Sequence, residues 1–213
     1  MKKGLFITFE GVDGSGKTSV ITGVSNLLKE NGYTDFIITR EPGGSKISED
    51  IRNIILDKNN IEEDIRTEAL LYAASRRQHL FDIVLKKLEE GINVISDRYI
   101  DSSLAYQGYA RGIGIDNVLK INEFAIDGLF PDLTIYLDLD PKIGLERINQ
   151  GRQEKKDRLD NEKLNFHQKV YEGYQIIKEM YKDRFYTVDA SRDLNSIVLD
   201  VYNKIEELIK NND

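Results

Sequence analysis

Residues 11–18 combine three glycines with a lysine and a threonine at a spacing that suits phosphate binding. In order they are Gly11, Val12, Asp13, Gly14, Ser15, Gly16, Lys17 and Thr18, which fits the pattern G-x-x-x-x-G-K-[ST]. The glycines permit backbone angles that turn successive N–H groups toward one anion. Lys17 adds a positive charge for the outer phosphates, and Thr18 offers a hydroxyl to Mg²⁺. The pattern predicts that this phosphate loop binds a nucleoside triphosphate through all eight residues.

The neighbours of the phosphate loop support this prediction. Residues 4–9 form a short apolar run, which is typical of a buried strand. After the loop, one helical stripe carries Val20, Ile21, Val24, Leu27 and Leu28, and Asn31-Gly32 supplies a stop. A strand, a glycine-rich loop and a helix in that order point a helix N-terminus at phosphate. A purely structural glycine-rich turn is the alternative, and the flanking elements weigh against it.

Short apolar runs alternate with helical patterns along the chain. We expect further strands at residues 35–40, 92–97, 133–137 and 184–188. We expect helices at 47–56, 64–90, 116–127, 142–149 and 161–182, and a last helix capped by Asp193 or Asn195. The 64–90 helix should face the core with Leu70, Leu71, Ala74, Phe81, Val84, Leu85 and Leu88. The alternation predicts an α/β fold in one domain, 1–213, with a five-stranded parallel sheet flanked by helices on both faces.

Composition narrows the possible partners and location. The 213 residues carry 30 basic and 37 acidic side chains, a net charge of −7 that argues against a nucleic-acid partner. The chain has no cysteine, so disulfides and cysteine chemistry are excluded. No signal peptide and no apolar run of membrane-spanning length is visible. We therefore expect a cytoplasmic protein with no membrane partner.

Two further stretches suggest chemistry. Asp97 ends the strand predicted at 92–97, where nucleotide-binding folds place a carboxylate that organises Mg²⁺. A solvated aspartate at a strand end is the alternative. Residues 150–160 are charged and have few apolar side chains. They predict either a solvated loop or a mobile lid that brings basic side chains over the phosphates.

A nucleoside triphosphate serves several classes of protein. A GTPase would carry a guanine-binding Asn-Lys-x-Asp tetrapeptide, which the sequence lacks. A motor or transporter ATPase would need a larger assembly than 213 residues provide. A small-molecule kinase needs an acceptor pocket and a lid that excludes water, because water in the site would hydrolyse the triphosphate. The sequence offers candidates for both, so it favours a kinase.

Several separated motifs, in order, closely resemble the bacterial thymidylate kinase family. They are Phe9-Glu10-Gly11 with the phosphate loop, residues 39–44, Ala73-Ala74-Ser75-Arg76-Arg77, and Asp97-Arg98-Tyr99 through Tyr106-Gln107-Gly108. The resemblance covers essentially the whole chain. It implies the P-loop NTPase fold of nucleoside monophosphate kinases. It also implies transfer of the γ-phosphoryl group from ATP to dTMP, with Mg²⁺, to give dTDP.

The resemblance also assigns the residues that hold the thymidine nucleotide. Arg76 would donate to thymine O4, and its donor fork would reject the amino group of cytosine. Tyr72 would stack on the base, where many relatives have Phe. Ser103 and Gln107 would bond the base edge. Tyr106 would lie against the 2′ position of the sugar and exclude ribonucleotides.

The remaining assignments concern charge at the reacting phosphates. Arg52 and Arg98 would clamp the monophosphate in line with the γ-phosphate, and Arg40 would join them or remain a surface residue. Glu10, Asp97 and Thr18 would organise Mg²⁺ and the acceptor side, directly or through water. The loop itself contains no arginine, so the resemblance places catalysis by lid side chains on Arg152, with Arg158 as support. We count Lys17, Arg98, Arg152, Glu10 and Asp97 as the expected catalytic residues.

The resemblance further implies a homodimer supported by residues 64–90 and 116–127. Two other functions remain possible on the sequence alone. One is a phosphate-loop kinase for another small acceptor. The other is a non-catalytic protein whose interactions depend on a bound nucleotide, which would have no acceptor pocket.

Overall fold

The protein is described by a computed structural model that covers residues 3–151 and 164–212. Its centre is one parallel sheet whose strands lie in the order β2-β3-β1-β4-β5. The strands are β1 (Phe6–Glu10), β2 (Phe36–Arg40), β3 (Asn93–Asp97), β4 (Leu133–Asp138) and β5 (Phe185–Asp189). The predicted five-stranded parallel sheet is therefore confirmed. In a parallel sheet all the carboxyl ends share one edge, so the segments that follow the strands are brought together there.

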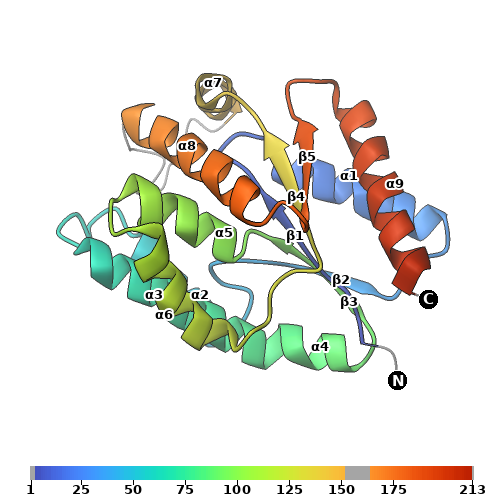
Figure 1. The fold of residues 1–213 in the computed structure, drawn as a ribbon, viewed down its shortest axis with the longest axis horizontal. Coiled ribbons are helices and arrows are strands. Elements are labelled where there is room, and N and C mark those ends of the chain that lie inside the picture. Colours follow the sequence, from blue (N-terminus) through green and yellow to red (C-terminus); the bar gives the residue numbers. More distant parts are fainter. Residues whose placement is uncertain (1–2, 152–163, 213) are drawn as a thin grey trace.

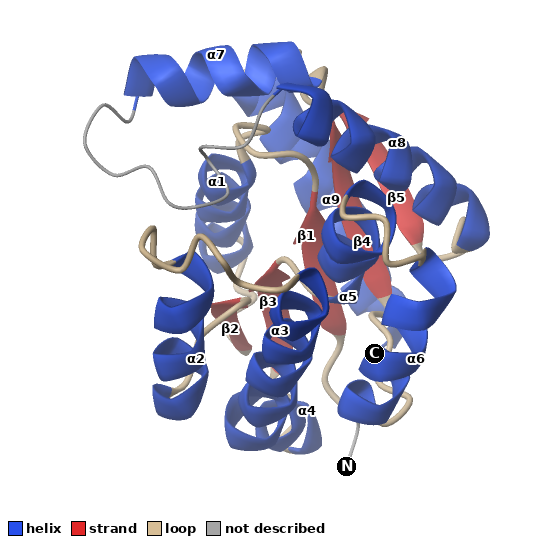
Figure 2. Cartoon of the chain, turned by 90° about the vertical axis from the view of Figure 1, so that its left-hand side faces the viewer, coloured by secondary structure: helices blue, strands red, loops and turns tan. Residues whose placement is uncertain are grey.

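Helices cover both faces of the sheet (Figure 1). One layer contains α1 (Lys17–Glu30) and α9 (Leu194–Asn212), which pack on each other. The other side carries α2 (Lys46–Leu56), α3 (Ile65–His79), α4 (Leu85–Glu89), α5 (Ile100–Ser103), α6 (Ile115–Ile126) and α8 (Leu164–Met180). The helix α7 (Pro141–Gly151) lies beyond the carboxyl edge of the sheet, above α1 in Figure 2. None of the described helices is long and apolar enough to cross a membrane.

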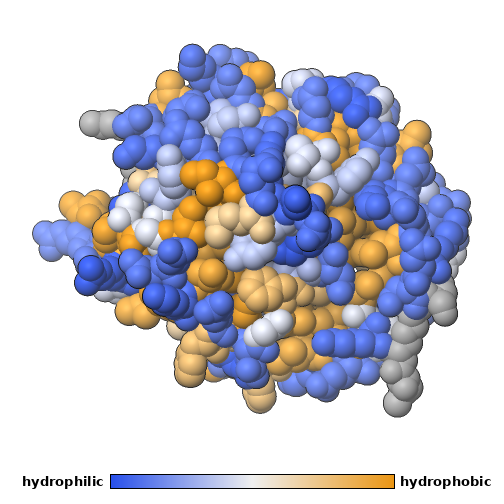
Figure 3. Space-filling model, viewed as in Figure 1, coloured by the Kyte–Doolittle hydropathy of each residue, from blue (hydrophilic) through white to orange (hydrophobic). Residues whose placement is uncertain are grey.

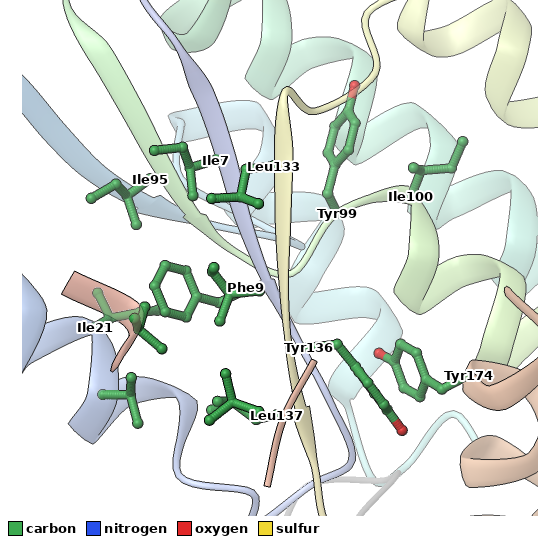
Figure 4. Close-up of a cluster of buried hydrophobic side chains, with 14 of the residues drawn as sticks. Ile7, Phe9, Ile21, Ile95, Tyr99, Ile100, Leu133, Tyr136, Leu137 and Tyr174 are labelled. Carbon is green, nitrogen blue, oxygen red and sulfur yellow. The ribbon is translucent and has the colours of Figure 1, made fainter. Parts of the chain in front are cut away.

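The core fills both sides of the central strands. Every residue of β1 is buried, as expected for a strand with helices on both faces. Figure 4 shows Phe9 and Leu137 on the side of Ile21 from α1, while Tyr136 faces Tyr174 from α8. The rings of Tyr136 and Tyr174 have centroids 5.2 Å apart. The core thus fixes α1 and α8 relative to the end of β1, where the phosphate loop begins.

The predicted helix 64–90 differs from the structure in two ways. It is built from α3, a π-helical turn η1 (Leu80–Val84) and α4, and it begins after Asp64, whose side chain accepts from two backbone N–H groups. The predicted core face was wrong at three positions. Leu70 is 55% exposed and Phe81 57% exposed, and Ala74 is exposed as well. The buried stripe instead includes charged residues that belong to the site described below.

The segment 102–109, to which the sequence assigned no element, is helical. It comprises α5 and a π-helical stretch, η2 (Leu104–Ala110). Gly108 in η2 packs closely against the backbone of Ile115. A π-helical stretch marks a local insertion in a helix and is often found at functional sites. Asp193, one of the two caps expected for the last helix, caps α9 and accepts from the N–H of Ser196 at 2.9 Å. The start predicted for the helix at 161–182 lies outside the described residues.

Candidate active site

A cavity of about 550 Å³ opens at the carboxyl edge of the sheet. Its walls come from the phosphate loop after β1, from the segment after β2, from the segment after β3, and from α2, α3, η2 and α7. The lining residues are Asp13, Gly14, Gly16, Lys17, Thr18, Ser19, Arg40, Glu41, Pro42, Arg52, Leu56, Tyr72, Asp97, Arg98, Ser102, Tyr106, Gln107, Arg147 and Ile148. This is the edge at which open parallel sheets bind ligands.

The phosphate loop leads directly into α1. Gly14 and Gly16 have φ angles of 75° and 89°, which side chains with a Cβ rarely adopt. A Cβ on Gly14 would also collide with the backbone of Gly144 in α7. Lys17 Nζ donates to Gly11 O at 3.0 Å and Val12 O at 3.1 Å. Burial lowers the pKa of Lys17 to about 8, with the charge of Arg98 acting in the same direction.

Thr18 and Asp97 offer oxygen ligands side by side. The Thr18 hydroxyl donates to Asp97 Oδ2 at 3.4 Å, which joins the start of α1 to the end of β3. Mg²⁺ is bound in such sites by one or two protein oxygens together with substrate phosphates and water. The described residues contain no cluster of three or more His, Cys, Asp or Glu side chains suited to a metal. Thr18 and Asp97 therefore fit a Mg²⁺ whose remaining ligands come from bound phosphates and water.

Arg98 connects the phosphate loop with the opposite wall. One terminal nitrogen donates to Gly11 O at 3.1 Å, and the other pairs with the carboxylate of Asp13. Tyr106 lies beside both, because its hydroxyl donates to Asp13 Oδ2 at 2.8 Å and its ring lies under the guanidinium. Although burial acts to raise it, the charges of Arg98 and Lys17 bring the pKa of Asp13 below its usual value. The side chain of Asp13 thus points toward Arg98 and Tyr106, on the far side of the cavity from the backbone of the loop.

The backbone of Arg98 is unusual. Its φ angle is 72°, in the left-handed region that costs a residue with a Cβ about 1–2 kcal/mol. The turn is held by neighbours, since Arg98 N donates to Phe9 O at 2.9 Å and Ser96 Oγ donates to Arg98 O at 2.8 Å. Strained backbone that is fixed from several sides is a feature of functional sites.

Glu10 is buried behind this turn and does not line the cavity. Its carboxylate accepts from Tyr99 N at 2.8 Å, from the hydroxyl of Ser102 at 2.6 Å and from the hydroxyl of Tyr174 at 2.8 Å. These donors occupy both oxygens. In this arrangement Glu10 holds the segment after Arg98 in place. Its expected role beside Mg²⁺ or the acceptor, directly or through water, stays a prediction.

The environment of Glu10 predicts a pH dependence of stability. Burial raises its pKa from the usual 4.5 to about 7, and the charge of Asp101 adds to the rise. The folded state binds this proton more tightly than the unfolded state does. The proton's contribution to the free energy of unfolding is therefore complete below pH 4.5 and is lost as the pH rises through 7. The loss is about 3 kcal/mol at 1.36 kcal/mol per pKa unit.

We therefore expect Glu10→Gln to flatten the pH profile of the unfolding free energy. Urea denaturation at pH 5 and pH 8 should show the wild type losing about 2.5 kcal/mol more than the variant over that interval. The hydroxyls of Ser102 and Tyr174 can accept as well as donate, so the amide is tolerated beside them. Equal slopes in the two proteins would contradict the assignment.

The wall opposite the phosphate loop is aromatic and polar. Tyr72, Tyr106 and Gln107 line it, so the structure brings together three of the residues assigned to the nucleotide. Arg76 and Ser103 lie behind this wall. Arg76 donates through Nε to Glu41 at 2.8 Å and through its terminal nitrogens to Ser103 Oγ, Asn122 and Tyr99 O. Its donors are all directed at protein acceptors, so its assigned bond to thymine O4 is not part of this arrangement.

Arg40 and Arg52 meet at one carbonyl. Arg52 donates to Pro42 O at 2.8 Å, and Arg40 donates to the same oxygen at 2.9 Å. Arg40 also pairs with Glu49 at 2.9 Å. The peptide bond between Glu41 and Pro42 is cis. Both arginines line the cavity, as Arg98 does, so the structure brings the three assigned arginines to one cavity.

Residues 9–201 match the family model named thymidylate kinase. The chain belongs to the thymidylate kinase family. It is 55% identical over 195 residues to the thymidylate kinase of Geobacillus sp. (strain WCH70), which covers 92% of each chain. It is 54% identical over 201 residues to that of Clostridium novyi (strain NT), covering 94% of this chain and 98% of the relative.

A solved structure agrees with this membership. The crystal structure of thymidylate kinase from Ehrlichia chaffeensis is similar to this fold with a TM-score of 0.76 at 31% identity. The match covers 96% of this chain and 99% of the other. The resemblance recognised in the sequence motifs is confirmed, and so is the fold expected of a thymidylate kinase.

Two assigned residues lie outside the part of the chain that the structure describes. They are Arg152 and Arg158, the lid arginines expected from the thymidylate kinase resemblance. Their roles stay predictions. The remaining assigned residues lie in or directly behind the cavity.

The residues of the site that were missed in the sequence include Tyr174, Arg147 and Ile148. Tyr174 was expected only to pack along its helix, yet its hydroxyl bonds to Glu10 and accepts from Arg98 at 3.2 Å. Arg147 and Ile148 line the cavity from α7, and Arg147 donates to Ala190 O at 3.2 Å. None of these three residues belongs to a short sequence motif that would have predicted its role. Their place at the site follows from how α7 and α8 return over the sheet.

Proposed function

We propose that this chain transfers the γ-phosphoryl group of ATP to dTMP and gives dTDP and ADP. The observation that carries the proposal is the single cavity shared by the phosphate loop and the aromatic wall. Arg98 bonds to Gly11 O on one side and lies on the ring of Tyr106 on the other. A donor phosphate and an acceptor phosphate in this cavity would meet at Arg98.

On the donor side, the N–H groups of the phosphate loop and the start of α1 bind the ATP phosphates. Lys17 lies within the loop and exchanges its carbonyl contacts for the outer phosphates. Thr18 and Asp97 would hold Mg²⁺, which supplies charge neutralisation between the phosphates. The side chains of Arg147 and Ile148, on α7, bound the cavity beside the loop.

On the acceptor side, Tyr72 provides a ring for the thymine and Gln107 provides its amide for the base edge. Tyr106 would lie against the 2′ position of the sugar, and its hydroxyl is held there by its bond to Asp13 at 2.8 Å. Arg40, Arg52 and Arg98 surround the position of the monophosphate with three guanidinium groups, which grip phosphate oxygens through paired N–H donors.

The transfer itself needs alignment and positive charge. The transition state spreads negative charge over the transferred oxygens, and little covalent chemistry is left for the protein. Arg98 and Lys17 bring fixed positive charges to the two phosphates. We keep Arg152 as the arginine that stabilises the transferred group and Arg158 as its support, a proposal that rests on the sequence resemblance.

The test is a panel of acceptors with ATP and Mg²⁺. We expect dTMP to exceed dCMP and AMP by at least about 100-fold in kcat/KM, because a site built to bond one base edge rejects another. UMP has the same base edge as dTMP, and we expect it to be rejected through its 2′-hydroxyl beside Tyr106. Equal use of another monophosphate would favour a kinase for a different acceptor. ATP binding without turnover of any acceptor would favour the non-catalytic alternative.

We also infer that the protein forms a homodimer through α3 and α6. These two helices pack on each other and expose Leu70 and Phe81, the latter in η1, together with Phe124, which is 90% exposed. Figure 3 shows orange, hydrophobic surface in the lower part of the view, where Figure 1 places α4 and α6. Contiguous apolar surface often marks a protein interface.

Light scattering should give about twice 24.5 kDa, and Phe124→Asp should halve that mass. A monomer at all concentrations would contradict the inference.

A further inference from the structure

The side-chain amide of Gln107 lies against a buried carboxylate, at the cavity wall that Gln107 forms with Tyr72 and Tyr106. Glu68, in the first turn of α3, and Gln107, in η2, are each 1% exposed. Gln107 Nε2 donates to Glu68 Oε1 at 2.9 Å. Arg111 donates to both oxygens of the same carboxylate, at 3.3 and 3.2 Å. The guanidinium of Arg111 also lies 4.5 Å from the centroid of the Phe166 ring, which helps to hold Arg111 in place. Arg111 thus holds the carboxylate of Glu68 from a second side.

This contact fixes which way the amide of Gln107 faces. The carbonyl and the NH₂ of a glutamine have nearly the same shape, so packing alone does not choose between them. A carboxylate only accepts hydrogen bonds. With the amide reversed, Gln107 Oε1 would face Glu68 Oε1 at hydrogen-bond distance with no proton between them, and a buried contact of that kind is costly. Glu68 therefore selects the orientation with Nε2 toward α3.

The selected orientation leaves a defined edge for a ligand. One N–H of Gln107 is used on Glu68, which leaves the carbonyl and the other N–H of the amide for a ligand. Among the described residues, nothing donates to Gln107 Oε1. Since Gln107 lines the cavity, the edge that it can present is an acceptor beside a donor.

This edge distinguishes thymine from cytosine. Thymine has an N3–H donor next to its O4 acceptor, which matches an acceptor beside a donor. Cytosine has an N3 acceptor next to its amino donor, which would match the reversed amide. A single flip of Gln107 would therefore exchange the preferred base, and a site with unpaired buried polar groups rejects its ligand strongly.

We propose that Glu68 is a positioning residue that fixes the amide of Gln107 and thereby sets the preference for thymine over cytosine. The inference rests on the proposed function, since it concerns the acceptor of that reaction. Glu68 does not touch the nucleotide. Arg111 keeps the carboxylate of Glu68 in its place, and Gln107 transmits the choice to the base.

The direct test is Glu68→Gln, which keeps the shape and lets position 68 offer either an acceptor or a donor. We expect the ratio of kcat/KM for dTMP over dCMP to fall by at least about tenfold, because Gln107 is then free to reverse. The matched control is Glu62→Gln, an exposed glutamate just before α3, which should leave the ratio unchanged.

A double variant separates positioning from a general structural effect. In the Gln107→Met background no amide remains to be oriented, so adding Glu68→Gln should change the dTMP/dCMP ratio by less than about twofold. The same tenfold fall in both backgrounds would overturn the proposal. So would an unchanged ratio in Glu68→Gln while the wild type prefers dTMP, an outcome that leaves the proposed function standing. A wild type without preference for dTMP would overturn both.

If Glu68→Gln does not fold, the wild type can be tested directly. The side-chain NH₂ of Gln107 can be assigned by ¹⁵N NMR of the dTMP-bound protein against Gln107→Met. We expect its protons to exchange with water at least about tenfold more slowly than those of exposed glutamines, with one shifted downfield by the carboxylate. Two rapidly exchanging protons would overturn the proposal.

Discussion

Lys17→Ala is expected to lower kcat by about 10³-fold while the protein remains folded. Removing one well-placed donor to developing charge costs about 10²–10³ in rate, and Lys17 carries a full positive charge in a buried position. Among the residues that the structure describes, its amino group donates to two loop carbonyls and to the hydroxyl of Ser15. Little of the fold depends on these bonds, so the loss should appear in turnover. Steady-state kinetics with saturating ATP and dTMP measure it.

The control for Lys17 is Lys29→Ala on the same helix. Lys29 is exposed in the last turn of α1, far from the loop, and contacts the Phe36 ring at 5.9 Å. Its removal should leave kcat unchanged, and circular dichroism should give similar melting curves for both variants. A Lys17→Ala enzyme with more than about a tenth of the wild-type kcat would remove Lys17 from the catalytic role.

Arg98→Lys is expected to lower kcat/KM for dTMP by about 10²–10³-fold, although the charge is retained. Arg98 donates to five acceptors: Gly11 O, Asp13 Oδ1, Ser102 Oγ, Tyr106 OH and Tyr174 OH. An ammonium group is a single point with three donors and cannot reproduce the planar fork. Misplacement of the acceptor phosphate by about 1 Å is enough to cost 10² in rate.

The Arg98 variant should affect the two substrates unequally. KM for dTMP should rise more than KM for ATP, because the phosphate loop keeps its own donors. Arg192→Lys is a fitting control, since Arg192 is exposed and pairs with Asp200 at 2.7 Å, outside the cavity. Equal changes of both KM values would argue against Arg98 as the clamp on the acceptor phosphate.

The sequence predicted what depends on local pattern. The phosphate loop and α1 were found because their glycines, lysine and apolar stripe lie within about twenty consecutive residues. Asp97 was found because it directly follows the apolar residues of a strand. These elements need no knowledge of distant contacts, since their backbone requirements are written in neighbouring residues.

What the sequence did not predict depends on residues far apart in the chain. The hydrogen bonds that hold Glu10 were not predicted, because its partners include Tyr174, 164 positions away. Leu70 was placed in the core because it is apolar, whereas the buried stripe of α3 carries Glu68 and Arg76. These charges are buried because η2 and the segment after β2 bring them partners. A hydrophobic pattern cannot reveal such a network.

The central claim is that the two phosphates meet in one cavity with Arg98 between its walls. A crystal structure with dTMP, Mg²⁺ and a non-hydrolysable ATP analogue tests it most directly. We predict the γ-phosphorus within about 3–3.5 Å of an acceptor phosphate oxygen and in line with it, with Arg98 bonded to the acceptor phosphate. Nucleotides bound in separate places, or dTMP with its phosphate turned away from the phosphate loop, would contradict the account.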